Sequence, residues 1–395
     1  MRVLFFNRSA EPVGGGMNRM VIDTASRLNL AGHEVAMVHG REGGTFDGTG
    51  YIYDDLEERL LPKDRNALRL EAILEDFSPD VIQLHGVQNT LLDGWLAARK
   101  PTARFLHNHD FYCSGRMLAL RRPSVPCTRP HGRECCASHL LRGCGSGNPL
   151  INFLRYRSVG RSLAALRMVH GLQVMSGTVR QQLLANGLPA EKITTLPPYA
   201  PAPAEARYGS TSSVRTVLHV GGLLGRKGIW TMVRMVRQLP RDVQVLFVGG
   251  GQEGEALEAH VRRRGLGNRV RVLSDPTPGQ LSLLYREATL VAMPVRWNEP
   301  LGLEGLAAMA YGKPVVAFDT GGVREWLAHG ETGLCIPFGA RWAFRDALVG
   351  LLKDPPRLQA MGRRAQEVWE KKFRPERHID ALIAHYEKLR AEVGR

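Results

Sequence analysis

Residues 293–317 read Met-Pro-Val-Arg-Trp-Asn-Glu-Pro-Leu-Gly-Leu-Glu-Gly-Leu-Ala-Ala-Met-Ala-Tyr-Gly-Lys-Pro-Val-Val-Ala, and this stretch decides the fold of the chain. An apolar strand is predicted to end at Pro294, and the loop after it presents Glu299. A helix of small residues is then predicted to begin near Leu301 and to end at Gly312, before a second buried strand. This order of elements is typical of a parallel sheet covered by helices.

The same alternation extends along both halves of the chain. Strands are predicted at Val3–Phe6, Val35–Val38, Val81–Leu84, Arg104–Leu106 and Leu172–Met175, and then at Val214–Val220, Val243–Val248, Val270–Leu273, Leu290–Met293 and Val315–Phe318. Amphipathic helical stretches such as Met17–Leu30 and Leu68–Phe77 lie between most of the first set. The sequence therefore predicts an α/β protein with two Rossmann-like, doubly wound domains.

Domain boundaries follow from composition. Residues 198–213 are rich in proline, glycine and serine, which predicts a linker. We expect an N-terminal domain at 1–197, with a cysteine- and arginine-rich insertion at 111–149, and a C-terminal domain at 214–375. Residues 376–395 have the apolar spacing of a final helix. Two such domains are expected to bind a ligand in the cleft between them.

Composition limits where the protein acts and what it binds. The 395 residues contain no apolar run near the roughly 20 residues that span a bilayer, and Met1–Asn7 has the pattern of a strand rather than a signal peptide. We therefore expect a cytoplasmic protein. The net charge of +15 favours phosphates, anionic lipids or acidic polymers, so peripheral contact with the inner membrane face is a further expectation. A generally basic proteome is the alternative explanation.

Glycine turns follow several predicted strands. Gly14, Gly15 and Gly16 precede the first helix, and 221–228 contains Arg226 and Lys227 at another helix start. Free N–H groups and cations at such positions suit a diphosphate. Gly250, in a third glycine turn, would let a nucleotide base approach the backbone, although an ordinary tight turn explains that segment nearly as well.

Residues 293–317, together with Gly321–Glu325 and Gly330–Leu334, resemble the sequence motifs of glycosyltransferase family 4. The resemblance covers nearly the whole chain. It implies the GT-B fold, a terminal helix that crosses back to the N-terminal domain, and retaining sugar transfer from a nucleotide sugar.

The resemblance also implies roles for individual residues. Glu299 would contact hydroxyl groups of the donor sugar, and Lys227 would contact the diphosphate. The remaining residues are Gly302 and Leu303 at the distal phosphate and nucleotide, Gly15 and Gly16 at the phosphates and acceptor, His109 at the donor sugar, and His85 on the acceptor side. His109 is otherwise explained as a buried histidine with its hydrogen bonds satisfied.

Two positions depart from the family pattern. Ala307 stands where the family has a second glutamate that binds the ribose, and Glu304, almost one helical turn earlier, would substitute for it approximately. Gly222 stands where the family has arginine, and Arg226 would supply that charge.

The insertion contains five of the six cysteines. A structural zinc site is predicted from Cys113, Cys127, Cys144 and one of Cys135 or Cys136, and we expect Cys135 to be the fourth ligand. Disulfides or reduced thiols are the alternatives, because no Cys-x-x-Cys pair is present.

Arginine is concentrated in the same region. Residues 103–167 contain eleven arginines, no lysine and two acids. We expect Arg121 and Arg122 to favour an acidic or phosphate-bearing acceptor, which could be a glycan, a lipid-linked sugar or a small molecule.

We therefore expect a retaining glycosyltransferase that uses a nucleoside-diphosphate sugar. The chain has no Asp-x-Asp motif, so catalysis is expected to require no metal or other cofactor, with cations and helix N-termini offsetting the phosphate charge. The alternatives are a GT-B phosphorylase or epimerase, and a degenerate homologue that binds sugar or nucleic acid. Nucleic acid is not an expected partner of the enzyme.

Overall fold

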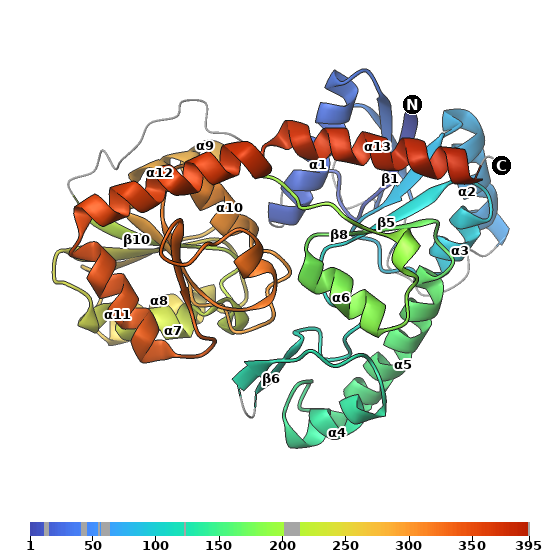
Figure 1. Cartoon of the computed structure of the whole chain (residues 1–395). Coiled ribbons are helices and arrows are strands. Elements are labelled where there is room, and N and C mark those ends of the chain that lie inside the picture. The colour runs from blue at the N-terminus through green and yellow to red at the C-terminus, as the bar shows by residue number, and fades with distance from the viewer. Residues whose placement is uncertain are drawn as a thin grey trace. The chain divides into compact units, whose positions relative to one another are not determined.

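The computed structural model describes residues 1–11, 16–40, 46–53, 56, 64–121, 124–200 and 214–393. They form two compact units (Figure 1). The first unit contains Met1–Leu118, Thr128–Pro197 and Glu376–Arg395, and the second contains Ala119–Cys127 and Pro198–Pro375. The insertion expected at 111–149 is therefore divided between the units rather than belonging wholly to the first.

The first unit is built on a seven-stranded sheet with the order β3-β2-β1-β4-β5-β8-β9. All neighbouring strands are parallel. The strands are β1 (Arg2–Phe6), β2 (Glu34–His39), β3 (Thr49–Ile52), β4 (Val81–Leu84), β5 (Thr102–Leu106), β8 (Gly171–Val174) and β9 (Ile193–Thr195). The five strands predicted for this half are present, and β3 and β9 are short edge strands that the prediction missed.

Helices surround this sheet. They are α1 (Gly16–Leu30), α2 (Asp64–Phe77), α3 (Leu91–Ala97), α4 (Arg133–Leu141), α5 (Pro149–Leu166), α6 (Gly177–Ala185) and α13 (Pro375–Val393), with a 3-10 turn η3 at Ala190–Lys192. The start of α5 shows why these helices begin where they do. The side chain of Asn148 accepts hydrogen bonds from the N–H groups of Leu150 and Ile151, and Pro149 occupies the first helical turn.

A buried ion pair crosslinks the sheet of the first unit to α3. Arg104 of β5 donates to Asp93 of α3 over 2.9 Å through Nε and to the carbonyl of Val87 over 3.0 Å. Both charged side chains are inaccessible to solvent, and the guanidinium also lies 4.7 Å from the centroid of the Phe111 ring. The geometry satisfies these charges by hydrogen bonds, which burial demands.

Helix α13 completes the first unit (Figure 1). The Tyr386 hydroxyl donates to Gln83 Oε1 of β4 over 2.9 Å, and the ring of His385 lies 3.2 Å from the Thr194 hydroxyl of β9. Arg390 pairs with Asp80 at 3.2 Å. The last helix therefore packs against the sheet that the first residues of the chain begin.

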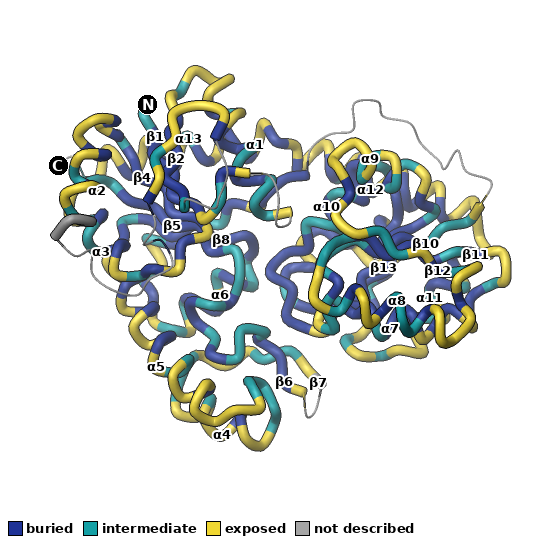
Figure 2. The backbone as a smooth tube through the Cα atoms, turned by 180° about the vertical axis from the view of Figure 1, so that it is seen from behind, coloured by how far each residue is buried: buried dark blue, intermediate teal, exposed yellow. Residues whose placement is uncertain are grey.

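The second unit repeats the architecture with six parallel strands in the order β12-β11-β10-β13-β14-β15. The strands are β10 (Arg215–Val220), β11 (Val243–Val248), β12 (Val270–Leu273), β13 (Leu290–Met293), β14 (Val315–Phe318) and β15 (Gly333–Ile336). The five predicted strands are present, four of them with the predicted bounds, and β15 was missed. Figure 2 shows the strand backbones of both sheets as predominantly buried.

The helices of the second unit follow its strands. They are α7 (Ile229–Met235), α8 (Gly254–Arg263), α9 (Pro278–Glu287), α10 (Leu303–Ala310), α11 (Arg341–Leu352) and α12 (Pro355–Lys372), with 3-10 turns η4 (Gly225–Lys227), η5 (Val236–Gln238) and η6 (Gly321–Glu325). The small antiparallel hairpin of β6 (Ala119–Arg121) and β7 (Ser124–Pro126) groups with this unit. None of the helices in the described part of the chain is long and apolar enough to cross a bilayer.

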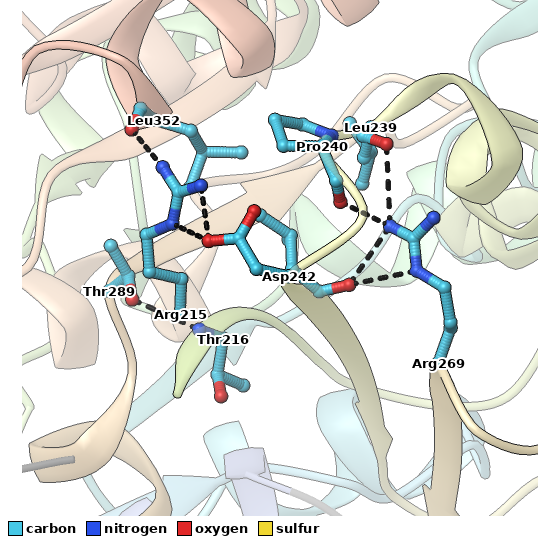
Figure 3. Close-up of polar contacts among 9 residues, drawn as sticks. Arg215, Thr216, Leu239, Pro240, Asp242, Arg269, Thr289 and Leu352 are labelled. Carbon is cyan, nitrogen blue, oxygen red and sulfur yellow. Dashed lines mark hydrogen bonds and ion pairs between the residues drawn. The ribbon is translucent and has the colours of Figure 1, made fainter. Parts of the chain in front are cut away.

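Two arginines form hydrogen bonds at the amino ends of the strands of the second sheet (Figure 3). Arg215, the first residue of β10, donates to Asp242 over 2.7 Å and to the carbonyl of Leu352 at the end of α11. The ion pair lowers the pKa of the Asp242 carboxyl. Arg269 donates to the Pro240 and Val243 carbonyls over 2.6 and 2.9 Å. These contacts fix the start of β11 beside β10.

Two histidines follow β4 and β5 at their carboxyl ends, His85 buried and His107 partly buried. His85 and His107 approach to 3.1 Å through Nδ1 and Nε2, and His107 stacks on Phe105 with ring centroids 4.6 Å apart. His378 of α13 lies beside the same phenylalanine and contacts the carbonyl of Pro197 at 3.0 Å. Burial lowers the pKa of His107 to about 3 and that of His378 to about 4, so both are neutral in the fold at neutral pH.

These histidines predict acid sensitivity of the first unit. An unfolded histidine takes up a proton as the pH falls below about 6.5, whereas His107 in the fold does not until about pH 3. The unfolded state thus binds more protons in this window, and at pH 5 His107 alone lowers the free energy of unfolding by about 2 kcal/mol. Hydrogen exchange of peptides covering β4 and β5 measures this unit separately. His107→Phe should make the free energy of unfolding of this unit depend less on pH, whereas exposed His329→Gln should not. The same dependence on pH in the wild type and both variants would contradict the assignment to His107.

Candidate functional site

Two strand-to-helix loops meet at the centre of the second sheet. The strand order reverses direction between β10 and β13, and such a switch point opens a crevice at the carboxyl ends of the strands. The loop after β10 leads through η4 to Lys227, and the loop after β13 carries Glu299. Gly228 has a φ of +88°, and a side chain there would clash with the carbonyl of Pro294, so the loops can approach only with glycine at this position.

Lys227 connects two carboxylates. Its ammonium lies 3.0 Å from Glu299 Oε2 and 2.8 Å from Glu304 Oε1. The side chains of Lys227, Glu299 and Glu304 are 14%, 6% and 17% exposed, so the group is largely shielded but still reaches solvent. The structure thus brings together three residues that the sequence analysis assigned to the donor site.

The charges of this group depend on one another. Burial alone would lower the pKa of Lys227, but the two carboxylates raise it well above the usual value. Burial raises the pKa of Glu299, and the charge of Glu304 adds to that effect. Burial acts in the same direction on Glu304, but Lys227 outweighs it and lowers the pKa of that carboxyl. The lysine is therefore a permanent cation at this position.

Trp297 holds Glu299 through a hydrogen bond. Its indole Nε1 donates to Glu299 Oε2 over 2.6 Å. The Arg226 guanidinium lies 5.3 Å and the Lys227 ammonium 5.4 Å from the centroid of its ring. The indole thus holds one carboxylate and places two cations on its faces. The role of this residue was not predicted from the sequence, although it stands two positions before Glu299.

The backbone around Glu299 is fixed as well. Its carbonyl accepts a hydrogen bond from the N–H of Gly322 over 2.9 Å, and a side chain at Gly321, where φ is +57°, would clash with that carbonyl. Gly302 has a φ of +95° and caps α10, which begins at Leu303. The first N–H groups of a helix have no partner within the helix and attract anions.

Gly250 lies beside the glycine turn that follows β10. Its carbonyl accepts a hydrogen bond from the N–H of Leu223 over 2.8 Å. A side chain at Gly250 would press on the carboxylate of Asp275, which has an unusual φ of +46°. The backbone at Gly250 is thus held close to the loop that leads to Lys227.

The other predicted residues lie in the first unit or in the hairpin. His109 is buried, and its Nδ1 lies 2.6 Å from the Tyr112 hydroxyl. His85 is buried against His107 and the ring of Phe5. Gly16 begins α1, Arg121 is exposed at the end of β6, and Gly15 and Arg122 lie outside the described residues.

The described residues do not show the predicted zinc site. In the described ranges, no three side chains of histidine, cysteine, aspartate or glutamate come together so as to hold a metal ion. Cys113 lies in the turn after His109, Cys127 ends the β6–β7 hairpin, and Cys144 follows α4. Cys135 lies on α4 with its thiol 3.9 Å from the carbonyl of Pro130. Cys113 and Cys144 lie close together, because a side chain at Gly115 would contact the thiol of the first and the carbonyl of the second.

Two family models match the chain. The model described as glycosyl transferases group 1 matches residues 204–368, and the model described as Glycosyltransferase Family 4 matches residues 14–199. The chain belongs to glycosyltransferase family 4. The family predicted from residues 293–317 is therefore confirmed.

Relatives of this glycosyltransferase include two proteins named D-inositol 3-phosphate glycosyltransferase. The Segniliparus rotundus protein is 32% identical over 237 residues, which cover 56% of this chain and 51% of that protein. The Nocardia farcinica protein is 28% identical over 390 residues, which cover 89% of this chain and 80% of that protein. The first alignment thus spans about half the length of that relative.

Solved structures share the fold. The Anabaena protein Alr3699/HepE, in complex with UDP and glucose, aligns with 98% of this chain and 100% of its own, with a TM-score of 0.72 and 18% identity. Sucrose-phosphate synthase from Thermosynechococcus elongatus aligns with 99% of this chain and 100% of its own, with a TM-score of 0.73 and 20% identity. These likenesses confirm the predicted GT-B fold with two Rossmann-like halves.

Trp297→Phe tests whether the indole N–H holds Glu299. The substitution keeps the ring beside Arg226 but removes a hydrogen bond to a charged, buried group, so the free energy of unfolding should fall by about 1.5–3 kcal/mol in urea titrations. Trp342→Phe, at an exposed tryptophan of α11, is the matched control and should change it little. Equal losses in the two variants would show that the hydrogen bond contributes nothing specific.

Proposed function

We propose that this glycosyltransferase moves a hexose-type sugar from a nucleoside-diphosphate sugar to a phosphate-bearing acceptor, with retention of the anomeric configuration. The observation that carries the proposal is the position of Lys227, held between Glu299 and Glu304 at the switch point of the second sheet. A fixed cation beside the N-terminus of α10 suits a diphosphate.

The donor would use groups that the fold already orients. An ammonium has three N–H donors, and two of them serve Glu299 and Glu304, which leaves one for a phosphate oxygen. Arg226 adds a second positive charge, and the N–H groups at Gly302 and Leu303 add further donors. The carboxylate of Glu299 has lone pairs for sugar hydroxyls in addition to those that accept from Lys227 and Trp297.

The chemistry then follows from leaving-group stabilisation. The bond between the sugar C1 and the distal phosphate oxygen breaks, and the acceptor oxygen bonds to C1 on the same face. The acceptor proton passes to the departing phosphate, so no side-chain base is required. Lys227, Arg226 and the start of α10 stabilise the negative charge that develops on that phosphate, and this arrangement does not call for a metal ion.

Different observations support the proposed acceptor and the proposed nucleotide. The relatives are named for inositol 3-phosphate, which supports an acceptor with a phosphate group. Structures of the Anabaena neighbour contain UDP, which supports a uridine diphosphate donor as the first to be tried. The arginine-rich composition around Arg121 agrees with an anionic acceptor.

Lys227→Ala tests the donor site. It removes the cation that stabilises the leaving phosphate, so kcat/KM for transfer from UDP-sugars should fall about 10²-fold to 10³-fold. Product release is followed by chromatography, and the anomeric configuration of the product is read by NMR. The exposed Lys371→Ala variant of α12 serves as the control and should keep full activity. Transfer unaffected by Lys227→Ala would exclude this site. Formation of a sugar phosphate or an epimerised donor, with no new glycosidic bond, would identify a different reaction on the fold.

Arg121→Ala tests the acceptor separately. With inositol 3-phosphate as the acceptor, KM should rise up to about fivefold, because an exposed charge contributes modestly. Inositol without phosphate should be a poor acceptor for both proteins, and donor hydrolysis should not change. Arg263→Ala on α8 is the matched exposed control. An equal loss with both acceptors would argue against phosphate recognition by this residue.

A further inference from the structure

Helices α4 and α5 expose an unusual number of large apolar side chains. Leu140 and Leu141 at the end of α4 are 73% and 77% exposed, and Leu150 at the start of α5 is 64% exposed. Ile151, Phe153 and Leu154 are exposed beside them on the first turns of α5. The two helices pack together, so these six residues, called the α4–α5 surface below, lie in one region (Figures 1 and 2).

This exposure is not explained by the core of the first unit. Helix α5 already buries an opposite face, with Val159, Leu163 and Leu166 in the hydrophobic core. In the first turns of α5 the buried residue is Asn152, whereas Leu150, Ile151, Phe153 and Leu154 are exposed, so the outward face, which is usually polar in a surface helix, is apolar here. Other exposed apolar residues, such as Leu30, Leu283 and Trp342, stand on separate helices. Isolated exposed residues need no partner, whereas a contiguous group does.

The surroundings of the surface are strongly basic. Residues 128–167 contain seven arginines and a single acid, Glu134, which pairs with Arg129 at 2.9 Å. Arg157 and Arg161 are exposed on the face of α5 that carries Leu150 and Leu154, one and two turns further along. The guanidinium of Arg157 lies 6.0 Å from the centroid of the Phe153 ring. Apolar and cationic groups thus share one side of the helix.

We propose that the α4–α5 surface docks on an anionic lipid bilayer. Leucine and phenylalanine side chains would enter the interface between headgroups and acyl chains, and the arginines beside them would bind lipid phosphates. A second copy of the chain is a poorer partner, because a two-fold interface here would bring Arg157 and Arg161 of both copies together. The surface contributes no residue to the donor site, so this proposal does not depend on the proposed function.

Vesicle flotation of the full chain tests the docking, with no donor or acceptor present. Wild-type protein should float with vesicles of phosphatidylcholine and phosphatidylglycerol, and should stay unbound with phosphatidylcholine alone. The triple variant Leu150→Ser, Phe153→Ser, Leu154→Ser should bind at least about tenfold more weakly. Arg157→Gln and Arg161→Gln should each weaken binding about fivefold at low salt, with a smaller effect at high salt.

The controls separate docking from general effects. Leu283→Ser and Trp342→Ser remove exposed apolar groups elsewhere, and Arg263→Gln removes an exposed charge, and all three should leave vesicle binding unchanged. Thermal melting of every variant reports whether the fold is intact.

Three results would overturn the proposal. They are no binding of folded wild-type protein to anionic vesicles, equal loss of binding in the control variants, and sedimentation of the wild type as a dimer that the triple variant converts to a monomer.

Discussion

The attraction between one ammonium group and two carboxylates is the constraint on which the second unit depends. Glu299 and Glu304 are too well shielded to carry charge near each other without a cation, and Lys227 arrives from a different strand to supply it. The loops after β10 and β13 must therefore come within side-chain reach. That requirement explains why glycine stands at position 228, where a side chain would clash with the carbonyl of Pro294 in the opposite loop. Trp297, in that same loop, adds a hydrogen bond from its N–H to Glu299.

Most of the fold could be predicted because buried parallel strands leave a clear pattern. Strands such as β13 and β14 are continuous apolar runs, and their predicted bounds are those of the structure. The missed strands lack that pattern. β3 is Thr-Gly-Tyr-Ile at a sheet edge and mostly exposed, and β9 has only three residues. The hairpin of β6 and β7 was missed for the same reason, and its grouping with the second unit depends on contacts far apart in sequence, which no local pattern records.

The site was predictable where chemistry and position coincide. Lys227 and Glu299 each follow a strand and precede a helix start, so their residue type and location pointed to the same role. Trp297 was missed because an aromatic residue near a strand end is more often part of the core, and only its geometry shows the hydrogen bond to Glu299. The cysteines show the limit of residue type alone. They suggested metal, but spacing along the chain does not tell which thiols come together, and no group of three ligating side chains forms among the described residues.

The path of the chain has a consequence for biosynthesis. The first unit begins at Met1, yet α13 supplies Tyr386, whose hydroxyl reaches Gln83 in the middle of the sheet, and His378, which contacts Phe105. A nascent polypeptide that has emerged only as far as Pro197 exposes the surface against which α13 packs in the complete unit. The unit whose synthesis starts first is thus completed only after the whole second unit has been made, because residues 376–393 follow that unit in the chain.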